Sequence, residues 1–153
     1  MAAKRSAGIL LYRRDPLQVL LVHPGGPFFA RKDDGVWSIP KGEYSPDEDP
    51  LACARREFEE ELGSPVPDGS VLELGEITQR AGKVVTAWAA EGDLDVSTVV
   101  SNTFEMEWPP RSGRTASFPE IDRAEWFDVD TAREKLVPAQ AEFVERLLIT
   151  LRG

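Results

Sequence analysis

The chain has 153 residues and a formal net charge of −9, from 18 Lys and Arg against 27 Asp and Glu. An apolar fraction of 41% is too high for a disordered protein, and the length predicts one domain over residues 1–153. The negative charge argues against a general nucleic-acid binder, which needs a basic face. The single cysteine, Cys53, excludes an internal disulfide framework, and the single histidine, His23, excludes an HExxH metal motif.

The first 40 residues predict a pair of strands followed by a loop. Residues 8–12 and 18–22 are apolar runs on either side of a predicted turn at Asp15-Pro16, so we expect them to pair as antiparallel strands. Gly and Pro residues predict a loop over 24–35, and Trp37–Ile39 predicts a short strand that Pro40 ends. Neither apolar run has the roughly 18 residues of a membrane span or the length of a signal-peptide core, and we therefore expect a cytoplasmic protein.

The clearest predicted helix covers Pro50–Leu62. Asp49 can cap its first turn, Pro50 suits the first helical position, and Gly63 can end it in a left-handed conformation. One apolar stripe at helical spacing is made of Leu51, Ala54, Phe58 and Leu62.

The second half predicts more strands and two further helices. The predicted strands are Val71–Thr78, Lys83–Ala90, Thr103–Trp108 and Arg123–Phe127. Asp130 is the predicted cap of a short helix that runs to Leu136, and the last helix is predicted to begin near Pro138. This order favours an α+β fold in which helices cover a mixed sheet, and it does not fit a repeating βαβ array.

Acidic residues concentrate between Gly42 and Gly63. At 100° per residue, Glu57, Glu60 and Glu61 share an arc of about 100° on the predicted helix, whereas Glu59 points away. Like charges at this spacing destabilise a helix by about 0.2–0.5 kcal/mol per pair, and the helix dipole disfavours anions near its C-terminus. A solvated acidic face is the simple alternative, but a hard divalent cation gives a reason for the arrangement, because Mg²⁺ and Mn²⁺ prefer oxygen ligands.

The spacing of this segment is specific. It reads Gly42, five residues, Glu48, seven residues, Arg56-Glu57-Phe58, one residue, Glu60-Glu61, one residue, Gly63. It resembles the Nudix box, the signature of the Nudix hydrolase superfamily, with Ser64 in place of an aliphatic residue as the one departure. The fixed positions would match by chance on the order of once in a million chains.

The resemblance implies an α/β/α sandwich with a catalytic loop–helix–loop. It also implies an enzyme that uses Mg²⁺ or Mn²⁺ to cleave a nucleoside diphosphate that is linked to another group. By matching position, Glu57 and Glu61 are metal ligands, Glu60 is a ligand or a general base, and the Gly42 carbonyl is a further ligand. The lead-in Pro40–Glu43 is similar to the branch of small nucleoside triphosphate and dinucleoside polyphosphate pyrophosphohydrolases.

Residues around the box receive roles from the same resemblance. Arg56 and Glu48 orient the carboxylates through salt bridges, and an acid outside the box often completes the site. Glu120 has the matching position, before the strand that precedes the last helix, and is expected to be a metal ligand or the general base. The rivals for this role are Glu105, Glu107 and Glu125.

Basic residues near the box are candidates for binding substrate phosphates. Lys41 adjoins Gly42 and can act as a point charge. Arg31 and Lys32 lie in the loop before Trp37 and can hold distal phosphates, although loop charges are commonly just solvated.

The remaining candidates have simple structural interpretations. His23 has no partner motif and is expected to be structural or on the surface, and Cys53 is expected to be a small buried hydrophobe. Trp37 fits a core position better than a base-stacking one. The sequence leaves the roles of Trp88 and Tyr12 open.

Three functions are compatible with these expectations. The leading one is hydrolysis of a small nucleotide, by a monomer or homodimer without membrane or long nucleic-acid partners. A non-catalytic nucleotide-binding module of the same fold is the first alternative, although its box would usually be broken. Removal of RNA 5′ ends is the second, and the net charge of −9 counts against it.

Overall fold

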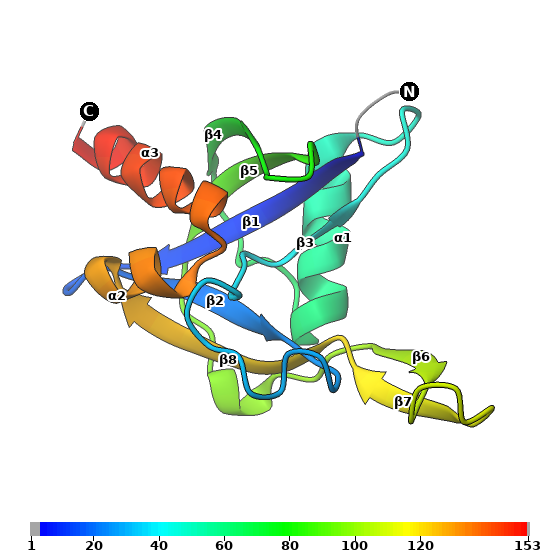
Figure 1. Cartoon of the computed structure of the whole chain (residues 1–153). Coiled ribbons are helices and arrows are strands. Elements are labelled where there is room, and N and C mark those ends of the chain that lie inside the picture. The colour runs from blue at the N-terminus through cyan, green and yellow to red at the C-terminus, as the bar shows by residue number, and fades with distance from the viewer. Residues whose placement is uncertain (1–3, 153) are drawn as a thin grey trace.

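The computed structural model describes residues 4–152 and has a mixed six-stranded sheet at its centre (Figure 1). The strands are β1 (Arg5–Arg13), β2 (Gln18–Pro24), β3 (Lys41–Glu43), β4 (Val71–Thr78), β5 (Val84–Glu91) and β8 (Ile121–Asp128). Their order is β4-β5-β1-β2-β8, and β3 also pairs with β1. Strands β1 and β5 are parallel and the other pairs are antiparallel, including the predicted pair β1–β2.

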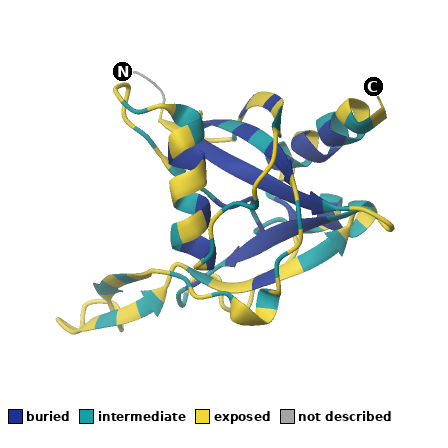
Figure 2. Cartoon of the chain, turned by 180° about the vertical axis from the view of Figure 1, so that it is seen from behind, coloured by how far each residue is buried: buried dark blue, intermediate teal, exposed yellow. Residues whose placement is uncertain are grey.

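Helix α1 (Pro50–Leu62) covers one face of this sheet, and α2 (Val129–Lys135) and α3 (Ala141–Arg152) cover the other. Successive side chains of β1 alternate between the two layers, as strand geometry requires. Ile9 belongs to the cluster that contains Phe58 of α1, and Leu10 belongs to the cluster that contains Phe143 of α3. With both faces covered, β1 and β2 are buried along almost their whole length, which explains their continuous apolar runs (Figure 2).

The bounds of α1 agree with the prediction. The Asp49 carboxylate accepts a hydrogen bond from the Ala52 backbone N–H at 3.0 Å, so it caps the first turn. Gly63 has φ 78° and its N–H donates to the Glu59 carbonyl, which ends the helix. The apolar stripe is buried at Ala54, Phe58 and Leu62 and half-buried at Leu51.

A separate two-stranded hairpin, β6 (Thr103–Glu107) and β7 (Thr115–Pro119), extends away from the sheet (Figure 1). The sequence predicts β6 but does not predict β7. Strand β7 has few of the residues that mark a buried strand, because its side chains alternate between exposed and half-buried. The hairpin returns the chain to β8, so Glu120 lies at the junction between β7 and β8.

Other boundaries also differ from the prediction. Trp37–Ile39 forms only isolated bridges to Val22 and Leu136, and the strand here is Lys41–Glu43. The cap of α2 is Asp128, which accepts from the Thr131 N–H, so the cap lies two residues before the predicted Asp130. A 3₁₀ turn η2 (Pro138–Gln140) precedes α3, and another, η1 (Val96–Thr98), comes after β5.

The helices are short. Helix α1 has 13 residues and α3 has 12. Within residues 4–152, no helix combines the length and apolar character needed to cross a membrane.

Candidate active site

The Glu57 side chain of α1 lies directly against the backbone of β3. A Cβ atom placed on Gly42 would be 2.1 Å from Glu57 Cδ and 2.4 Å from its Oε1, distances at which no real side chain fits. Glycine at position 42 is therefore required for the carboxylate to approach the strand. The Cys53 thiol, one turn earlier on α1, donates to the Gly42 carbonyl at 3.5 Å.

Glu61 is the buried carboxyl of the site. It is only 6% exposed, and its Oε2 accepts a hydrogen bond from the Lys41 backbone N–H at 3.1 Å. Burial raises the pKa of Glu61 to about 8; the Lys41 N–H opposes this shift, and the negative charges of Glu57 and Glu120 add to it. In the metal-free protein Glu61 is therefore mostly protonated at neutral pH, and a bound cation would replace that proton.

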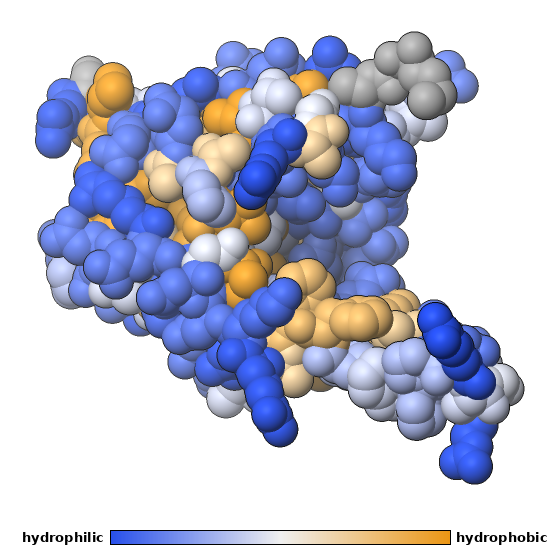
Figure 3. All heavy atoms as spheres, in the orientation of Figure 1, coloured by the Kyte–Doolittle hydropathy of each residue, from blue (hydrophilic) through white to orange (hydrophobic). Residues whose placement is uncertain are grey.

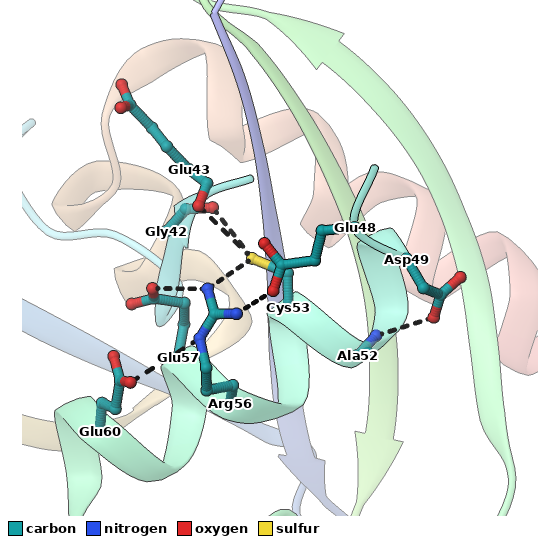
Figure 4. A network of polar contacts seen from close by, with 9 residues as sticks. All are labelled: Gly42, Glu43, Glu48, Asp49, Ala52, Cys53, Arg56, Glu57 and Glu60. Carbon is teal, nitrogen blue, oxygen red and sulfur yellow. Dashed lines mark hydrogen bonds and ion pairs between the residues drawn. The ribbon is translucent and has the colours of Figure 1, made fainter. Parts of the chain in front are cut away.

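Arg56 lies among three carboxylates and offsets their repulsion (Figure 4). Its guanidinium pairs with Glu48, with Glu57 at 3.3 Å and with Glu60 at 3.7 Å. Burial raises the pKa of Glu57, the hydrogen bond from Arg56 lowers it, and the charges of Glu60 and Glu120 raise it again, with a net upward shift. The structure thus places Arg56 and Glu48 where the predicted salt bridges require them.

Glu120 reaches the same cluster from the other end of the chain. Its charge contributes to the raised pKa of both Glu57 and Glu61. Asn102, which no sequence pattern singles out, connects the two segments: its N–H donates to the Glu60 carbonyl at 3.0 Å, and its carbonyl accepts from the Glu120 N–H at 2.8 Å. The sequence carries no signal for Asn102, since the contacts use only its backbone.

The rivals to Glu120 lie elsewhere. Glu105 and Glu107 are on the hairpin, where Glu107 accepts hydrogen bonds from the backbone of its own turn. Glu125 is an exposed residue within β8, opposite Leu21 of β2. None of the three is among the main causes of the pKa shifts of Glu57 and Glu61.

The donor set of the site suits a hard divalent cation. It consists of carboxylates from α1 and the β7–β8 junction, with the Gly42 carbonyl beside them, and such oxygen donors fit Mg²⁺ or Mn²⁺. Over residues 4–152, no three acidic, histidine or cysteine side chains already form a metal-holding cluster, and Arg56 pairs with Glu57 and Glu60. A bound cation would explain why the Glu61 carboxyl, with a pKa of about 8, is buried at this place, because the cation would compensate its negative charge.

A groove leads away from Glu61. Two hollows, of about 160 and 260 Å³, are both lined by Pro24, Val36, Ser38 and Lys41. The smaller also contains Glu61, and the larger continues to Phe29, Gln79, Val137 and Gln140. We call these two hollows together the Lys41 groove.

Of the predicted basic residues, only Lys41 lines this groove. Lys41 lines both hollows, and burial together with the charge of Lys83 lowers the pKa of its ammonium. The Lys32 ammonium lies over the Phe29 ring, 5.6 Å from its centre, and Phe29 lines the larger hollow. Arg31 is exposed on the same loop.

The aromatic candidates and Cys53 lie mainly in the core. Trp37 and Cys53 are fully buried, as expected. Tyr12 is buried in the cluster on the α3 side, and Trp88 is half-buried against the cluster on the α1 side. Figure 3 shows apolar surface beside the hairpin, where the adjoining loop exposes Phe28 and Phe29.

Comparison with known proteins identifies the class. The chain matches the NUDIX domain over residues 2–147. It is 30% identical over 156 residues to an RNA pyrophosphohydrolase of Rhodospirillum rubrum, with 97% of this chain and 92% of the relative covered. The chain therefore belongs to the NUDIX family and is a Nudix hydrolase, a pyrophosphohydrolase.

Solved structures confirm the predicted fold. An Ap4A hydrolase of C. elegans in a binary complex superimposes with a TM-score of 0.70 at 20% identity, covering 97% of this chain and 98% of the other. The NUDIX domain of Shewanella oneidensis NrtR, complexed with ADP ribose, has a TM-score of 0.67 at 17% identity, covering 99% and 90%. At these identities the likeness shows the α/β/α sandwich and not the substrate.

Glu61→Gln is expected to stabilise the metal-free protein at high pH. A carboxyl with an ordinary pKa of 4.5 and a folded pKa of about 8 binds its proton more tightly in the folded state. The free energy of unfolding therefore falls as pH rises from 4.5 to 8, and Gln, which cannot ionise, avoids this loss. With a chelator at pH 9, the unfolding temperature of the variant should exceed that of the wild type by at least about 2–4 °C, which corresponds to about 1 kcal/mol in the free energy of unfolding. At pH 5 the two unfolding temperatures should be nearly equal. An equal difference at both pH values in thermal unfolding would contradict this assignment.

Gly42→Ala is expected to displace the Glu57 carboxylate. The methyl group cannot fit beside Glu57 Cδ, so kcat/KM on a nucleotide substrate should fall at least about tenfold. Gly82→Ala is the control, because a Cβ there meets no atom within 4 Å although φ is +87°. The control should lose about 1 kcal/mol of stability and keep its kcat/KM per folded molecule, as measured by circular dichroism and steady-state kinetics. Equal losses of activity in the two variants would show that Gly42 has no special relation to Glu57.

Proposed function

We propose that the chain hydrolyses a pyrophosphate bond in a small nucleoside diphosphate derivative, a nucleoside triphosphate or a dinucleoside polyphosphate, with Mg²⁺ or Mn²⁺. The single observation that carries the proposal is the continuity between the buried Glu61 carboxyl and the Lys41 groove. One end of this groove is acidic and suits cations. The other end is walled by apolar side chains with the Gln79 amide beside them, which suits a nucleobase.

The lining of the groove is suitable for a nucleotide. Phe29, Val36 and Val137 supply apolar walls to the 260 Å³ hollow. The Gln79 amide also lines it and is held by a hydrogen bond from the buried Gln140 at 2.9 Å. Sites for small molecules are commonly apolar with a few polar groups that fix orientation. A base in this hollow would leave its phosphates near Lys41 and the carboxylates.

The residues of the chain then have distinct tasks. Glu57, Glu61 and Glu120, with Glu60 and the Gly42 carbonyl, would hold the cations, which would neutralise the diphosphate and activate a water molecule. Lys41 would bind a phosphate oxygen, while Lys32 and Arg31 would hold distal phosphates. Arg56 and Glu48 would keep the carboxylates of α1 in place when no cation is bound.

A second candidate function is removal of pyrophosphate from RNA 5′ ends. The relative at 30% identity, an RNA pyrophosphohydrolase, favours it. The net charge of −9 opposes it for long RNA, because phosphate contacts along a strand need a basic surface. A 5′-triphosphate end would occupy the same groove as a free nucleotide, so the two functions differ only in whether further nucleotides are attached to the first.

A substrate screen separates these candidates. Nucleoside triphosphates, dinucleoside polyphosphates, ADP-ribose and a 5′-triphosphate oligonucleotide are incubated with Mg²⁺ or Mn²⁺, and the products are identified by mass. We expect kcat/KM to be at least about tenfold higher for a free nucleotide than for the oligonucleotide, because the latter must bring additional phosphates against an acidic protein. A preference for the oligonucleotide would establish the second candidate instead.

Glu57→Gln tests whether this carboxylate takes part in the reaction. Loss of one carboxylate ligand should lower kcat at least about 100-fold while the fold is retained. Glu59→Gln is the matched control, because Glu59 lies on the exposed side of the same helix and its substitution removes the same charge. Equal kcat values in the two variants would contradict the assignment of Glu57 as a metal ligand.

A further inference from the structure

The lone histidine makes two short hydrogen bonds inside the protein. His23 is 1% exposed; its Nδ1 is 2.7 Å from the Asp122 carboxylate, and its Nε2 is 2.7 Å from the Lys32 carbonyl. A carboxylate and a carbonyl both accept hydrogen bonds and donate none. A neutral imidazole has one N–H, so it can satisfy one partner only. Both bonds form when both ring nitrogens carry protons, that is, when His23 is an imidazolium.

An irregularity in the sheet brings Asp122 to this position. His23 pairs with Arg123 and Pro24 pairs with Ile121, so Asp122 is an extra residue between two paired positions of β8. Such a bulge redirects a side chain that would otherwise keep to the alternation of the strand. The negative charge of Asp122 offsets the cost of burying the imidazolium.

Other charged groups surround this pair. The Trp37 ring packs edge-on to His23 at 5.2 Å, and the Arg123 guanidinium lies 5.0 Å from the centre of the Trp37 ring. Asp33 accepts a hydrogen bond from Trp37 Nε1 at 2.7 Å and pairs with Lys135. Arg123 and Asp33 thus reach the His23 pair only through Trp37, and Asp122 is the carboxylate in direct contact.

The two bonds of His23 join two walls of the site. Lys32 belongs to the loop 25–36, which carries Phe29 and Val36 of the Lys41 groove. Asp122 comes two residues after Glu120. The same two segments also meet where the Gly25 N–H donates to the Glu120 carbonyl at 2.8 Å, and a Cβ on Gly25 would be 1.9 Å from the Pro119 carbonyl oxygen.

We propose that His23 is a positioning residue, a buried imidazolium that fixes the loop 25–36 to the strand that begins just after Glu120. It thereby sets the places of Phe29 and Val36 in the groove. The assignment of the groove to substrate rests on the proposed function, whereas the charge state of His23 and its hold on the loop do not.

Nuclear magnetic resonance of the imidazole nitrogens tests the charge state without any substrate. The chain has a single histidine, so the ¹⁵N signals need no assignment. At pH 7 both ring nitrogens of the wild type should show the shifts of protonated nitrogen. In Asp122→Asn the imidazolium loses its counterion, and one nitrogen should lose its proton. A neutral tautomer in the wild type would overturn the proposal.

The hold on the loop is tested by hydrogen exchange and kinetics. In His23→Gln and Asp122→Asn, the amides of Lys32 and Gly35 should exchange at least about tenfold faster, with amides of β1 and β5 unchanged. KM for the nucleotide that the screen identifies should rise about fivefold or more, with kcat within about twofold. Asp68→Asn, remote from the His23 pair in the fold, is the control for loss of one negative charge.

The outcomes are separable. Unchanged loop exchange in both variants would overturn the positioning role, whatever the activity. Faster loop exchange with an unchanged KM would also overturn it, because the position of the loop would then not affect nucleotide binding in the groove. If the wild type turns over no nucleotide, the proposed function fails, while the nitrogen shifts and the exchange rates still decide the role of His23. Should His23→Gln fail to fold, Asp122→Asn, whose side chain is 32% exposed, carries the test.

Discussion

The contact between the Glu57 carboxylate and the backbone of Gly42 is the constraint on which the rest of the site depends. It fixes the distance between α1 and β3, and it is possible because Gly42 has no side chain. Cys53 and Glu61 on the same helix then meet the Gly42 carbonyl and the Lys41 N–H. A short strand and one helix face thus form a single unit that presents carboxylates at a sheet edge. Arg56 lets these like charges coexist before any cation arrives.

The same arrangement has a cost for the folded protein. Glu61 is a buried acid beside two other acids, and sites built for chemistry often contain groups that stability alone would exclude. The cost stays tolerable because a core on both faces of the sheet anchors the site. Phe58 and Leu62 of α1 are fully buried. The helix can therefore carry destabilising charges because its apolar stripe is well packed.

The sequence was most informative where the determinants are local. The bounds of α1 were predictable because Asp49, Pro50 and Gly63 act on neighbouring backbone groups. The Nudix resemblance predicted the fold and the acids of the helix because the spacing falls within 22 residues. The preference for Glu120 over its rivals depended on position in the family pattern and stays a prediction, although the charge of Glu120 contributes to the raised pKa of Glu57.

The features that could not be predicted depend on contacts between distant segments. Strand β7 is recognisable only from its pairing with β6. Trp37–Ile39 resembles a strand in sequence because it contains buried side chains, but it forms only isolated bridges, to Val22 and Leu136. Asn102 acts through its backbone, which leaves no trace in residue type. The partner of His23 was not predictable either, since Asp122 lies 99 positions away and faces it only through a bulge. The groove, likewise, is assembled from several separate segments.

The β6–β7 hairpin pairs only with itself among the described strands, yet it contacts the loop 25–36. The Phe28 and Trp108 rings meet edge-on at 6.1 Å, and Gly26 lies close to the Phe104 ring. Lengthening or shortening this hairpin would leave every ladder of the central sheet intact while moving one support of the groove wall. If the groove holds the substrate as proposed, changes at this appendage would alter ligand preference without disturbing the carboxylates of α1, and a protein engineer who wishes to alter selectivity would have the same freedom.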